Sequence, residues 1–434
     1  MISRIRTLRN RELVNLMVVA ALTFVGFGAV FIARENAVSG ASLSYAGLFL
    51  SLYLAAHIVL RIALPRADPY LLPLVALLTA VGEIEIYRIN PVLARDQGIW
   101  VAVGVVLFSI VVFGFRDVRR LQELRYTCGA LAVVLLAATV AVGTTVNGAR
   151  LWIRVGGYQI EPAEFSKVLL VVFLAGYLRE QREVLERPAR RIVGVGVPAL
   201  RHALPLLAIW GAALVLLVLV NDYGFSLLFF GVFLALLWVA TGRWLYVGTG
   251  LVAAIGGFAA ASRAAPHVAE RITIWLNPWS DPSNRGYQIV QSLYSIADGG
   301  IFGAGFGRGF VLVGHQTVIP FAQTDFIFSV IATETGLAGA AGVLLIYLVF
   351  VYRGLKIASM ADDGFSKLLA TGLTFAFGFQ AFVIVAGVTK MLPLTGVTLP
   401  FVSYGGSSLV ANFALVALLL CVSQRANRDV ETVA

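Results

Sequence analysis

Acidic and basic side chains interrupt an otherwise apolar sequence, and their spacing is the first guide to its chemistry. The segment 161–167 reads Glu-Pro-Ala-Glu-Phe-Ser-Lys. Pro162 suits the first turn of a helix, where its missing N–H costs no hydrogen bond. Glu164 and Lys167 then lie three residues apart and share one helix face. Two interpretations remain open: a structural ion pair buried in a helix bundle, or a pair that lines an outward-facing polar cavity.

Further charged residues lie on either side of this segment. Arg150 and Arg154 precede it, and Asp222 follows in the short polar stretch Asn221–Gly224. Because Asn, Asp and Gly all favour turns, Asp222 is equally well explained by a simple turn and by a functional acid. Ionisable groups at or inside a membrane boundary are costly, so they are candidates for function by default.

A second polar region lies in the segment 262–324, where Asp281 stands between two aromatic-containing turns. An Asp before Pro often only initiates a turn, but a carboxylate in such a place can also act as a general base. The run 299–309 is rich in glycine and superficially resembles a nucleotide-binding loop. No strand and no βαβ unit surround it, so we exclude that interpretation and expect close backbone packing.

The remaining polar signals come towards the end of the chain. Thr324 and Asp325 open an apolar run, where a carboxylate also suits a helix N-terminus. Glu334 lies nine residues further on, about 13 Å deeper along a helix, and needs a partner there. The segment Leu392–Ser408, which includes Ser403, combines prolines, glycines and hydroxyls and predicts a broken or re-entrant helix. Such backbone is tolerated at membrane depth only where protein or a wet cavity covers it.

The elements that must position these residues are membrane-spanning helices. Of the 434 residues, 59% are hydrophobic and only 13% are charged, and the mean hydropathy is +0.88. This excludes an ordinary cytosolic enzyme, a disordered protein and a nucleic-acid binder, because the chain lacks the charge that their surfaces need. Roughly twelve runs approach the ~20 residues that span a bilayer. They lie near 13–33, 43–64, 71–87, 98–115, 126–145, 164–178, 203–220, 224–241, 243–261, 325–352, 368–389 and 398–423.

The basic residues predict the orientation. The net charge is +10, and most of the positive residues fall at the start of the chain and in alternate loops. An excess of Lys and Arg marks the cytoplasmic side, so both termini are expected there and the loop 262–324 outside. The first run is interpreted as a retained helix rather than a cleaved signal peptide. The basic clusters are explained by orientation and by attraction to anionic lipid, without nucleic acid.

Metal and disulfide chemistry has little support in the sequence. The two cysteines, Cys128 and Cys421, lie inside apolar runs and build neither a disulfide framework nor a cysteine metal site. The four histidines are scattered, and no HxxxH or HExxH spacing occurs. No metal-ligand cluster is therefore expected.

Together these segments resemble the SEDS family (shape, elongation, division and sporulation), whose best-known members are RodA and FtsW. The resemblance covers about residues 70–425 and is carried by three features: 392–408, the Asn277-Pro, Asp281-Pro and Gly286-Tyr-Gln series, and Thr324-Asp-Phe-Ile-Phe. Family members usually have ten transmembrane helices, which implies an all-α polytopic fold of about twelve helices here, two of them extra at the N-terminus. The expected division is 1–67 for the N-terminal segment with the extra helices, 68–425 for the polymerase membrane domain with its long ordered external loop 262–324, and 426–434 for a cytoplasmic tail.

The resemblance implies a peptidoglycan glycosyltransferase of the bacterial cytoplasmic membrane. Family members polymerise lipid II into glycan strands at the outer face, together with a class B penicillin-binding protein and other elongation or division proteins. The donor sugar is α-linked and the product bond is β-1,4, so one inversion fits a direct displacement that releases polyprenyl pyrophosphate. The extra helix pair and the basic loop 179–201 favour an elongation role, RodA-like, over a division role, FtsW-like.

The resemblance also implies roles for individual residues. The family's essential loop aspartate falls on Asp281, the candidate base for the acceptor hydroxyl. Positions of the polar cavity and the substrate site fall on Glu164, Lys167, Asp222, Thr324, Asp325 and Ser403. Candidate partners for the departing pyrophosphate are the cations expected at the outer face: Arg150, Arg154, Lys167 and Lys390. A divalent cation such as Mg or Mn could share that role.

Several departures and two rival functions accompany this resemblance. Among the departures, the family's usual Pro-Glu-x-His-Thr-Asp reads Pro320-Phe-Ala-Gln-Thr-Asp325, and Asp298 and Lys390 stand where small neutral residues are common. The family's usual Gln-Pro-Ser-Glu reads Glu161-Pro-Ala-Glu164 here, and its usual Glu-Glu reads Thr333-Glu334. A lipid II flippase should show repeat symmetry and midplane sites, whereas the polar residues here gather towards one face under a long loop, which favours surface catalysis. A scaffold that only recruits a transpeptidase predicts that Asp281 is dispensable.

Overall fold

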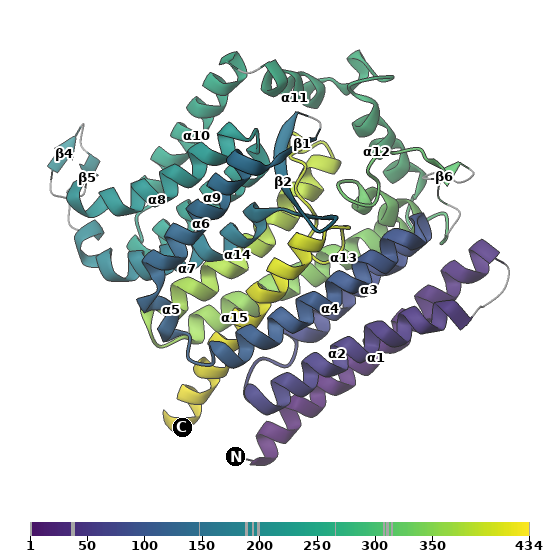
Figure 1. Cartoon of the computed structure of the whole chain (residues 1–434), viewed down its shortest axis with the longest axis horizontal. Helices are drawn as coiled ribbons and strands as arrows, with labels where there is room; N and C mark the ends of the chain where they lie inside the picture. The colour runs from purple at the N-terminus through teal and green to yellow at the C-terminus, as the bar shows by residue number, and fades with distance from the viewer. Residues whose placement is uncertain are drawn as a thin grey trace.

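The computed structural model describes residues 2–35, 40–146, 148–186, 190–192, 195–197, 200–264, 266–306, 309, 312–313 and 316–433. Long helices lie side by side, and both chain ends emerge at the same end of the bundle (Figure 1). Shorter helices and strands gather mainly at the opposite end. Parts of the predicted segments 179–201 and 299–309, and Asn147, lie outside the described residues.

A long helix occurs at each of the twelve apolar runs, which confirms the all-α polytopic prediction. Eight of the described helices are long and apolar enough to cross a membrane. The long helices are α1 (Ile2–Glu35), α2 (Gly40–Ala63), α3 (Leu71–Ile89), α4 (Pro91–Gly114), α6 (Arg125–Val142), α7 (Pro162–Glu186), α8 (Leu200–Leu219), α9 (Tyr223–Thr241), α10 (Trp244–Ala264), α13 (Ile327–Met360), α14 (Gly364–Val388) and α15 (Gly406–Val433).

The connecting segments hold short elements that hydropathy does not reveal. They are α5 (Arg119–Glu123), β1 (Thr144–Val146), β2 (Ala149–Val155), β3 (Tyr158–Ile160), β4 (Arg190–Ile192), β5 (Val195–Val197), α11 (Pro266–Leu276), η1 (Pro278–Ser280), α12 (Tyr287–Asp298), β6 (Leu312–Val313) and β7 (Gln316–Thr317). The described part of the loop between α10 and α13 is therefore folded, as predicted.

The three-stranded sheet β1-β2-β3 is an addition to the predicted all-α fold. Its strands are antiparallel, and Gly156 and Gly157 join β2 to β3 with φ of 56° and 87°. A two-residue hairpin loop needs positive φ at both positions, which glycine adopts without strain. A hydrogen bond from Arg150 N to Val220 O, at 3.1 Å, holds β2 against the α8–α9 turn.

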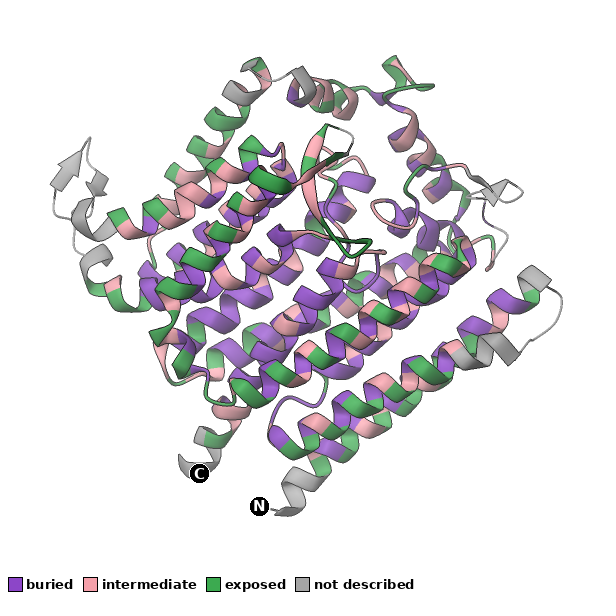
Figure 2. Cartoon of the chain, viewed as in Figure 1, coloured by how far each residue is buried: buried purple, intermediate pink, exposed green. Residues whose placement is uncertain are grey.

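The core lies between α7, α14 and α15, where buried residues dominate the ribbon (Figure 2). The extra helices pack on one side of this core, α1 against α3 and α2 against α4. Their interface holds buried charge: Arg9 Nη1 and His57 Nδ1 each lie 2.6 Å from a carboxylate oxygen of Glu12. The helix begins at Ile2, so Arg9, expected in an extramembrane basic start, is instead buried in the bundle.

Helix α13 is broken at Gly336, where φ is 67° and ψ is −168°. The glycine-rich segment inserts at the break: Ala304 N and Gly305 N donate to Thr333 O and Glu334 O at 2.9 and 3.0 Å. A Cβ at Gly303 would lie 2.0 Å from Glu334 O, so only glycine fits this approach. This confirms that the glycines serve close backbone packing.

Glu334 has an ion-pair partner, as expected for a carboxylate at its depth along the helix. Its Oε1 lies 2.6 Å from Arg88 Nε of α3, and both side chains are buried.

The last predicted run begins later than expected. The chain from 389 to 405 is not helical, and α15 starts at Gly406 rather than near 398. Positive φ at Lys390 and Phe401, together with burial of Val397 and Leu399, make this segment an irregular strip packed in the protein. The predicted interruption before the helix is thus observed, and protein covers it as membrane depth requires.

Candidate functional site

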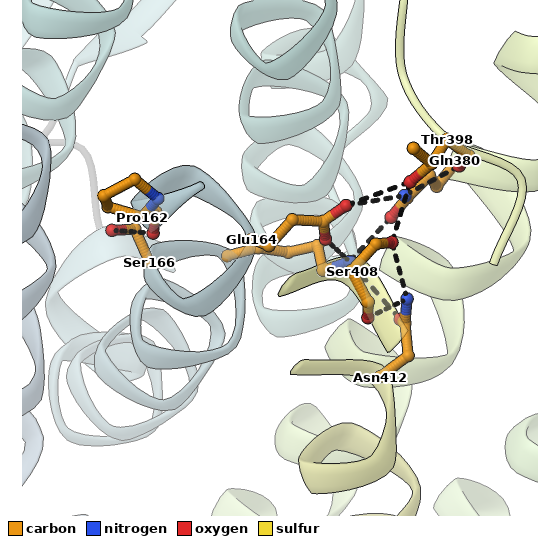
Figure 3. Close-up of polar contacts among 8 residues, drawn as sticks. Pro162, Glu164, Ser166, Gln380, Thr398, Ser408 and Asn412 are labelled. Atoms are coloured by element: carbon orange, nitrogen blue, oxygen red, sulfur yellow. Dashed lines mark hydrogen bonds and ion pairs between the residues drawn. The ribbon is translucent and has the colours of Figure 1, made fainter. Parts of the chain in front are cut away.

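Glu164 and Lys167 form the centre of a buried polar network. Figure 3 shows the side chain of Glu164 facing Gln380, with Asn412 nearby. Lys167 Nζ donates to Glu164 Oε2 at 2.7 Å, to Gln380 Oε1 at 2.6 Å and to Asn412 Oδ1 at 3.3 Å. The ammonium group has three hydrogens, so all of its donors are used. Helices α7, α14 and α15 each supply one side of this network.

The second oxygen of Glu164 faces the irregular strip between α14 and α15. Its Oε1 lies 3.2 Å from Thr398 Oγ1 and 3.4 Å from Gln380 Nε2. Thr398 Oγ1 also lies 2.7 Å from Ser408 Oγ, at the start of α15. With exposures of 0% and 1%, Glu164 and Lys167 have the geometry of an enclosed ion pair rather than of two cavity-lining side chains.

A second group of charges lies at the helix ends beside this network. Asp222 caps α9, with its Oδ1 accepting from Phe225 N at 2.9 Å, and it is buried. Its Oδ2 has no hydrogen-bond partner in the described structure. Burial raises the pKa of Asp222 to about 6, although the hydrogen bond from Phe225 and the charge of Arg271 oppose this rise.

Asp325 and Glu161 complete this acidic group. Burial raises the pKa of Asp325 to about 6, again against the opposing charge of Arg271. Burial and the neighbouring carboxylates of Glu164 and Asp222 also raise the pKa of Glu161 well above its usual range. The structure therefore brings together three acids from separate turns, with Arg271 of α11 as the cation that acts on Asp222 and Asp325.

Asp281 lies in the turn after η1 and is half-buried. Its Oδ1 accepts from Asn284 Nδ2 at 3.1 Å, and its Oδ2 from Arg285 N at 3.5 Å. Both contacts come from its own turn, and the second is long, so the half-buried carboxylate stays accessible to another donor.

Lys390 reaches the same turn from the end of α14. Its Nζ lies 4.9 Å from the centre of the Trp279 ring, two residues before Asp281. Its carbonyl accepts from Trp275 Nε1 at 3.1 Å, which fixes the loop on the irregular strip. A cation and a carboxylate from distant parts of the sequence thus flank one aromatic turn.

The other predicted site residues lie elsewhere. Ser403 Oγ donates to Thr324 O at 2.5 Å and accepts from Leu399 N at 2.9 Å, so it fastens the irregular strip to the chain that enters α13. Arg150 is exposed, and its Nη1 donates to Val140 O of α6 at 2.8 Å. Arg154 is exposed on β2, opposite Gln159. The part of the chain that the structure describes contains no group of three or more His, Cys, Asp or Glu that could hold a metal ion.

Comparison with known proteins agrees with this architecture. Residues 69–428 match the model of the FtsW, RodA and SpoVE family, described as cell cycle proteins. The chain belongs to this family. It is 39% identical over 439 residues to the peptidoglycan glycosyltransferase RodA of Mycobacterium tuberculosis (strain ATCC 25618 / H37Rv), and the match covers 98% of this chain and 92% of the relative.

Two of the solved structures that are similar to this chain show how far the likeness extends. One, described as "Structural coordination of polymerization and crosslinking by a peptidoglycan synthase complex", has a TM-score of 0.67 at 31% identity and covers 83% of this chain and 98% of that one. The rod shape determining protein RodA of Thermus thermophilus has a TM-score of 0.59 at 29% identity, with 82% and 96% covered. Because the mycobacterial match spans 98% of the chain, it takes in most of the α1–α2 pair, which precedes the family match.

Some residues of the site, among them Gln380, Asn412 and Arg271, were not among the predicted ones. Gln380 and Asn412 are isolated amides within long apolar runs, a signal of intramembrane polar function that the sequence does carry. Arg271 gave no such signal, because only the folding of α11 over the helix ends brings it to Asp222 and Asp325.

Proposed function

We propose that this chain is a peptidoglycan glycosyltransferase that polymerises lipid II into glycan strands for cell elongation. The observation that carries the proposal is the near full-length relationship to a relative named for that activity, at 39% identity over 98% of the chain. The folded loop that presents Asp281 above a membrane bundle agrees with chemistry on a lipid-linked substrate.

In the proposed step, Asp281 takes the proton of the acceptor hydroxyl. The hydroxyl oxygen then forms a bond to the anomeric carbon of the donor sugar, while the bond from that carbon to the pyrophosphate oxygen breaks. The electron pair leaves with the polyprenyl pyrophosphate, and the configuration inverts once. A well-placed base contributes roughly 10²–10⁴-fold to such a rate.

Lys390 is the proposed first partner of the departing pyrophosphate. Its ammonium lies beside the Asp281 turn, at 4.9 Å from the Trp279 ring, and positive charge there stabilises the negative charge that develops. Arg150 and Arg154 remain candidates for binding parts of the substrate further from the reacting atoms, because both are exposed on β2. Glu164 and Lys167 act at a distance, by holding α7, α14 and α15 in register beneath the site.

These steps are assigned to side chains of this chain, and a divalent cation such as Mg or Mn stays a proposal beside them. The acids Glu161, Asp222 and Asp325 interact electrostatically, but no group of three acids within the described chain has the geometry of a metal site. We therefore derive no step through Mg or Mn. The sites proposed for charge neutralisation are the side chains of Lys390 and Arg271.

The proposed orientation places both termini in the cytoplasm of a bacterial cell, with the loop between α10 and α13 outside. The two ends of the chain lie at one end of the bundle and that loop at the other (Figure 1), which suits this arrangement. A class B penicillin-binding protein is the proposed partner, with other elongation or division proteins. This agrees with the likeness to a peptidoglycan synthase complex of coordinated polymerisation and crosslinking.

The direct test is to reconstitute the purified chain in lipid nanodiscs, with and without a class B penicillin-binding protein, and to supply lipid II. We expect glycan strands to appear as a ladder on a polyacrylamide gel. Proteoliposomes that move lipid II across the bilayer without forming strands would instead identify a transporter. Strands that appear only from the partner's own activity would identify a scaffold.

A further inference from the structure

A cavity with several basic side chains in its wall lies far from the proposed catalytic loop, at the end of the bundle that carries both termini. Its volume is about 330 Å³, within the range of small-ligand pockets. Its walls are the first turns of α1, the loop 64–70, the last turns of α13 and the end of α15. Four cations and one carboxylate line it: Arg11, Arg66, Arg353, Lys356 and Asp68.

The single carboxylate of the cavity is already paired with a cation of the protein. Asp68 pairs with Arg353, whose guanidinium also lies over the Tyr70 ring at 4.6 Å from its centre. The exposed side chains of Arg11 and Lys356 have no carboxylate within ion-pair distance in the described structure. Arg11 and Lys356 therefore bring to the cavity positive charge that no carboxylate of the described residues pairs.

The floor of the cavity is rigid. Asp68 N donates to Ser423 Oγ at 2.9 Å, and Arg66 N to Gln424 Oε1 at 2.6 Å. Asn427 Nδ2 donates to Arg66 O at 2.7 Å, and the buried Arg9 holds Ala67 O from the other side. Because these bonds fix the backbone before any ligand arrives, binding there costs little ordering of the protein.

Apolar side chains complete the wall. Leu8 of α1, Ile357 and Met360 of α13 and Ala426 of α15 lie beside the cations. A ligand that satisfies both parts of the wall has an anionic head and an apolar body. Basic pockets between membrane helices on the cytoplasmic side bind the head groups of anionic lipids.

We propose that this cavity binds the phosphate head group of an anionic phospholipid, with Arg11 and Lys356 as its main contacts. Positive residues elsewhere on this face attract anionic lipid diffusely, but here the charges line a pre-formed cavity that is open to the surface. A neighbouring cavity with Arg116 and Arg425 is a weaker candidate, because Arg116 donates to Ala63 O at 2.8 Å and Arg425 pairs with Asp117 and Asp363.

The site depends on the N-terminal helix pair. Leu8 and Arg11 belong to α1, which precedes the family match at residues 69–428. Lipid bound there would join α1 to α13 and α15 and so couple the added helices to the family core. The inference rests on the proposed orientation only for the choice of leaflet, the inner one, and not on the glycosyltransferase activity.

The test uses the full-length protein in nanodiscs that contain phosphatidylcholine and a graded fraction of phosphatidylglycerol. The lipid retained after mild detergent extraction is counted by native mass spectrometry. The variant Arg11→Gln/Lys356→Gln removes two charges from the cavity, and Arg120→Gln/Lys367→Gln removes two from exposed positions on the same face. We expect the first variant to lose roughly tenfold in phosphatidylglycerol retention, and the control to match the wild type.

Two results would overturn the proposal. Equal losses in both variants would mean that the attraction is diffuse. Displacement of the retained lipid by millimolar glycerol phosphate, or equal stabilisation by glycerol phosphate in pure phosphatidylcholine discs, would assign the cavity to a soluble phosphate compound. The melting temperature of the cavity variant in pure phosphatidylcholine discs is the control for folding. A value equal to that of the wild type establishes that the variant is folded.

Discussion

Removal of Lys167 is the sharpest test of the buried network. In Lys167→Met, the carboxylate of Glu164 keeps its contacts with Thr398 and Gln380 but loses its cation, 2.7 Å away. Breaking a buried pair by removing one partner costs about 3–5 kcal/mol, because an uncompensated charge stays in the core. The retained contacts on Oε1 place the expected loss near the lower end, at about 3 kcal/mol.

The double variant Glu164→Gln/Lys167→Met separates charge from packing. Gln can still accept from Thr398 and Gln380, and replacing both partners of a buried pair by neutral groups is often neutral or stabilising. We therefore expect the double variant to lie within about 1 kcal/mol of the wild type, and the coupling energy to be at least about 2 kcal/mol. Lys367→Met is the matched control, because Lys367 is exposed and its loss should change stability by less than about 0.5 kcal/mol.

The assay is reversible unfolding in mixed detergent micelles, with the four members of the cycle measured side by side. If Lys167→Met lay within about 0.5 kcal/mol of the wild type, the enclosed pair would be refuted. The side chains would then be hydrated, as cavity-lining residues are.

Three further predictions concern the pH response, the helix break and the outer cation. The pKa of Asp222 rises from 3.8 to about 6 on folding, so the folded state binds more protons between those values and stability falls as pH rises through that window. From pH 4.5 to pH 7.5, the free energy of unfolding should therefore fall by about 1–3 kcal/mol less in Asp222→Asn than in the wild type, as measured by thermal melts. An unchanged pH profile would contradict this. Gly303→Ala forces a Cβ to 2.0 Å from Glu334 O at a φ of +81°, and should lower the free energy of unfolding by more than about 2 kcal/mol. The control Gly248→Ala, at an exposed position of α10, should be neutral or slightly stabilising. Lys390→Gln should slow lipid II polymerisation by roughly 10–100-fold at unchanged melting temperature, and full activity would remove Lys390 from the site.

Hydropathy was enough to place the helices, because a segment that crosses lipid must be apolar and must pair its backbone N–H and C=O groups within itself, as a helix does. It could not place the sheet of residues 144–160, whose strands are too short and too mixed in polarity to show alternation. The Gly156-Gly157 pair was the available signal for its hairpin, since few other sequences adopt positive φ twice in succession.

The site was predictable in part for the same kind of reason. The spacing of Glu164 and Lys167 follows from one helix, so the sequence alone indicates their pairing. The contacts of Lys167 with Gln380 and Asn412 join positions 213 and 245 residues apart, and only the packing of α7 on α14 and α15 decides them. Arg271 and Lys390 are likewise placed by loops that fold over the helix ends.

The role of Asp281 is the central claim, and one measurement tests it most directly. Lipid II polymerisation is compared between the wild type, Asp281→Asn and Asp298→Asn, each purified with the same partner in nanodiscs. Asp298 is an exposed aspartate at the end of α12 in the same loop, so it controls for loss of charge. The account predicts a loss of roughly 10²–10⁴-fold for Asp281→Asn with unchanged folding and partner binding, and near wild-type activity for Asp298→Asn. Near wild-type polymerisation by Asp281→Asn would contradict it.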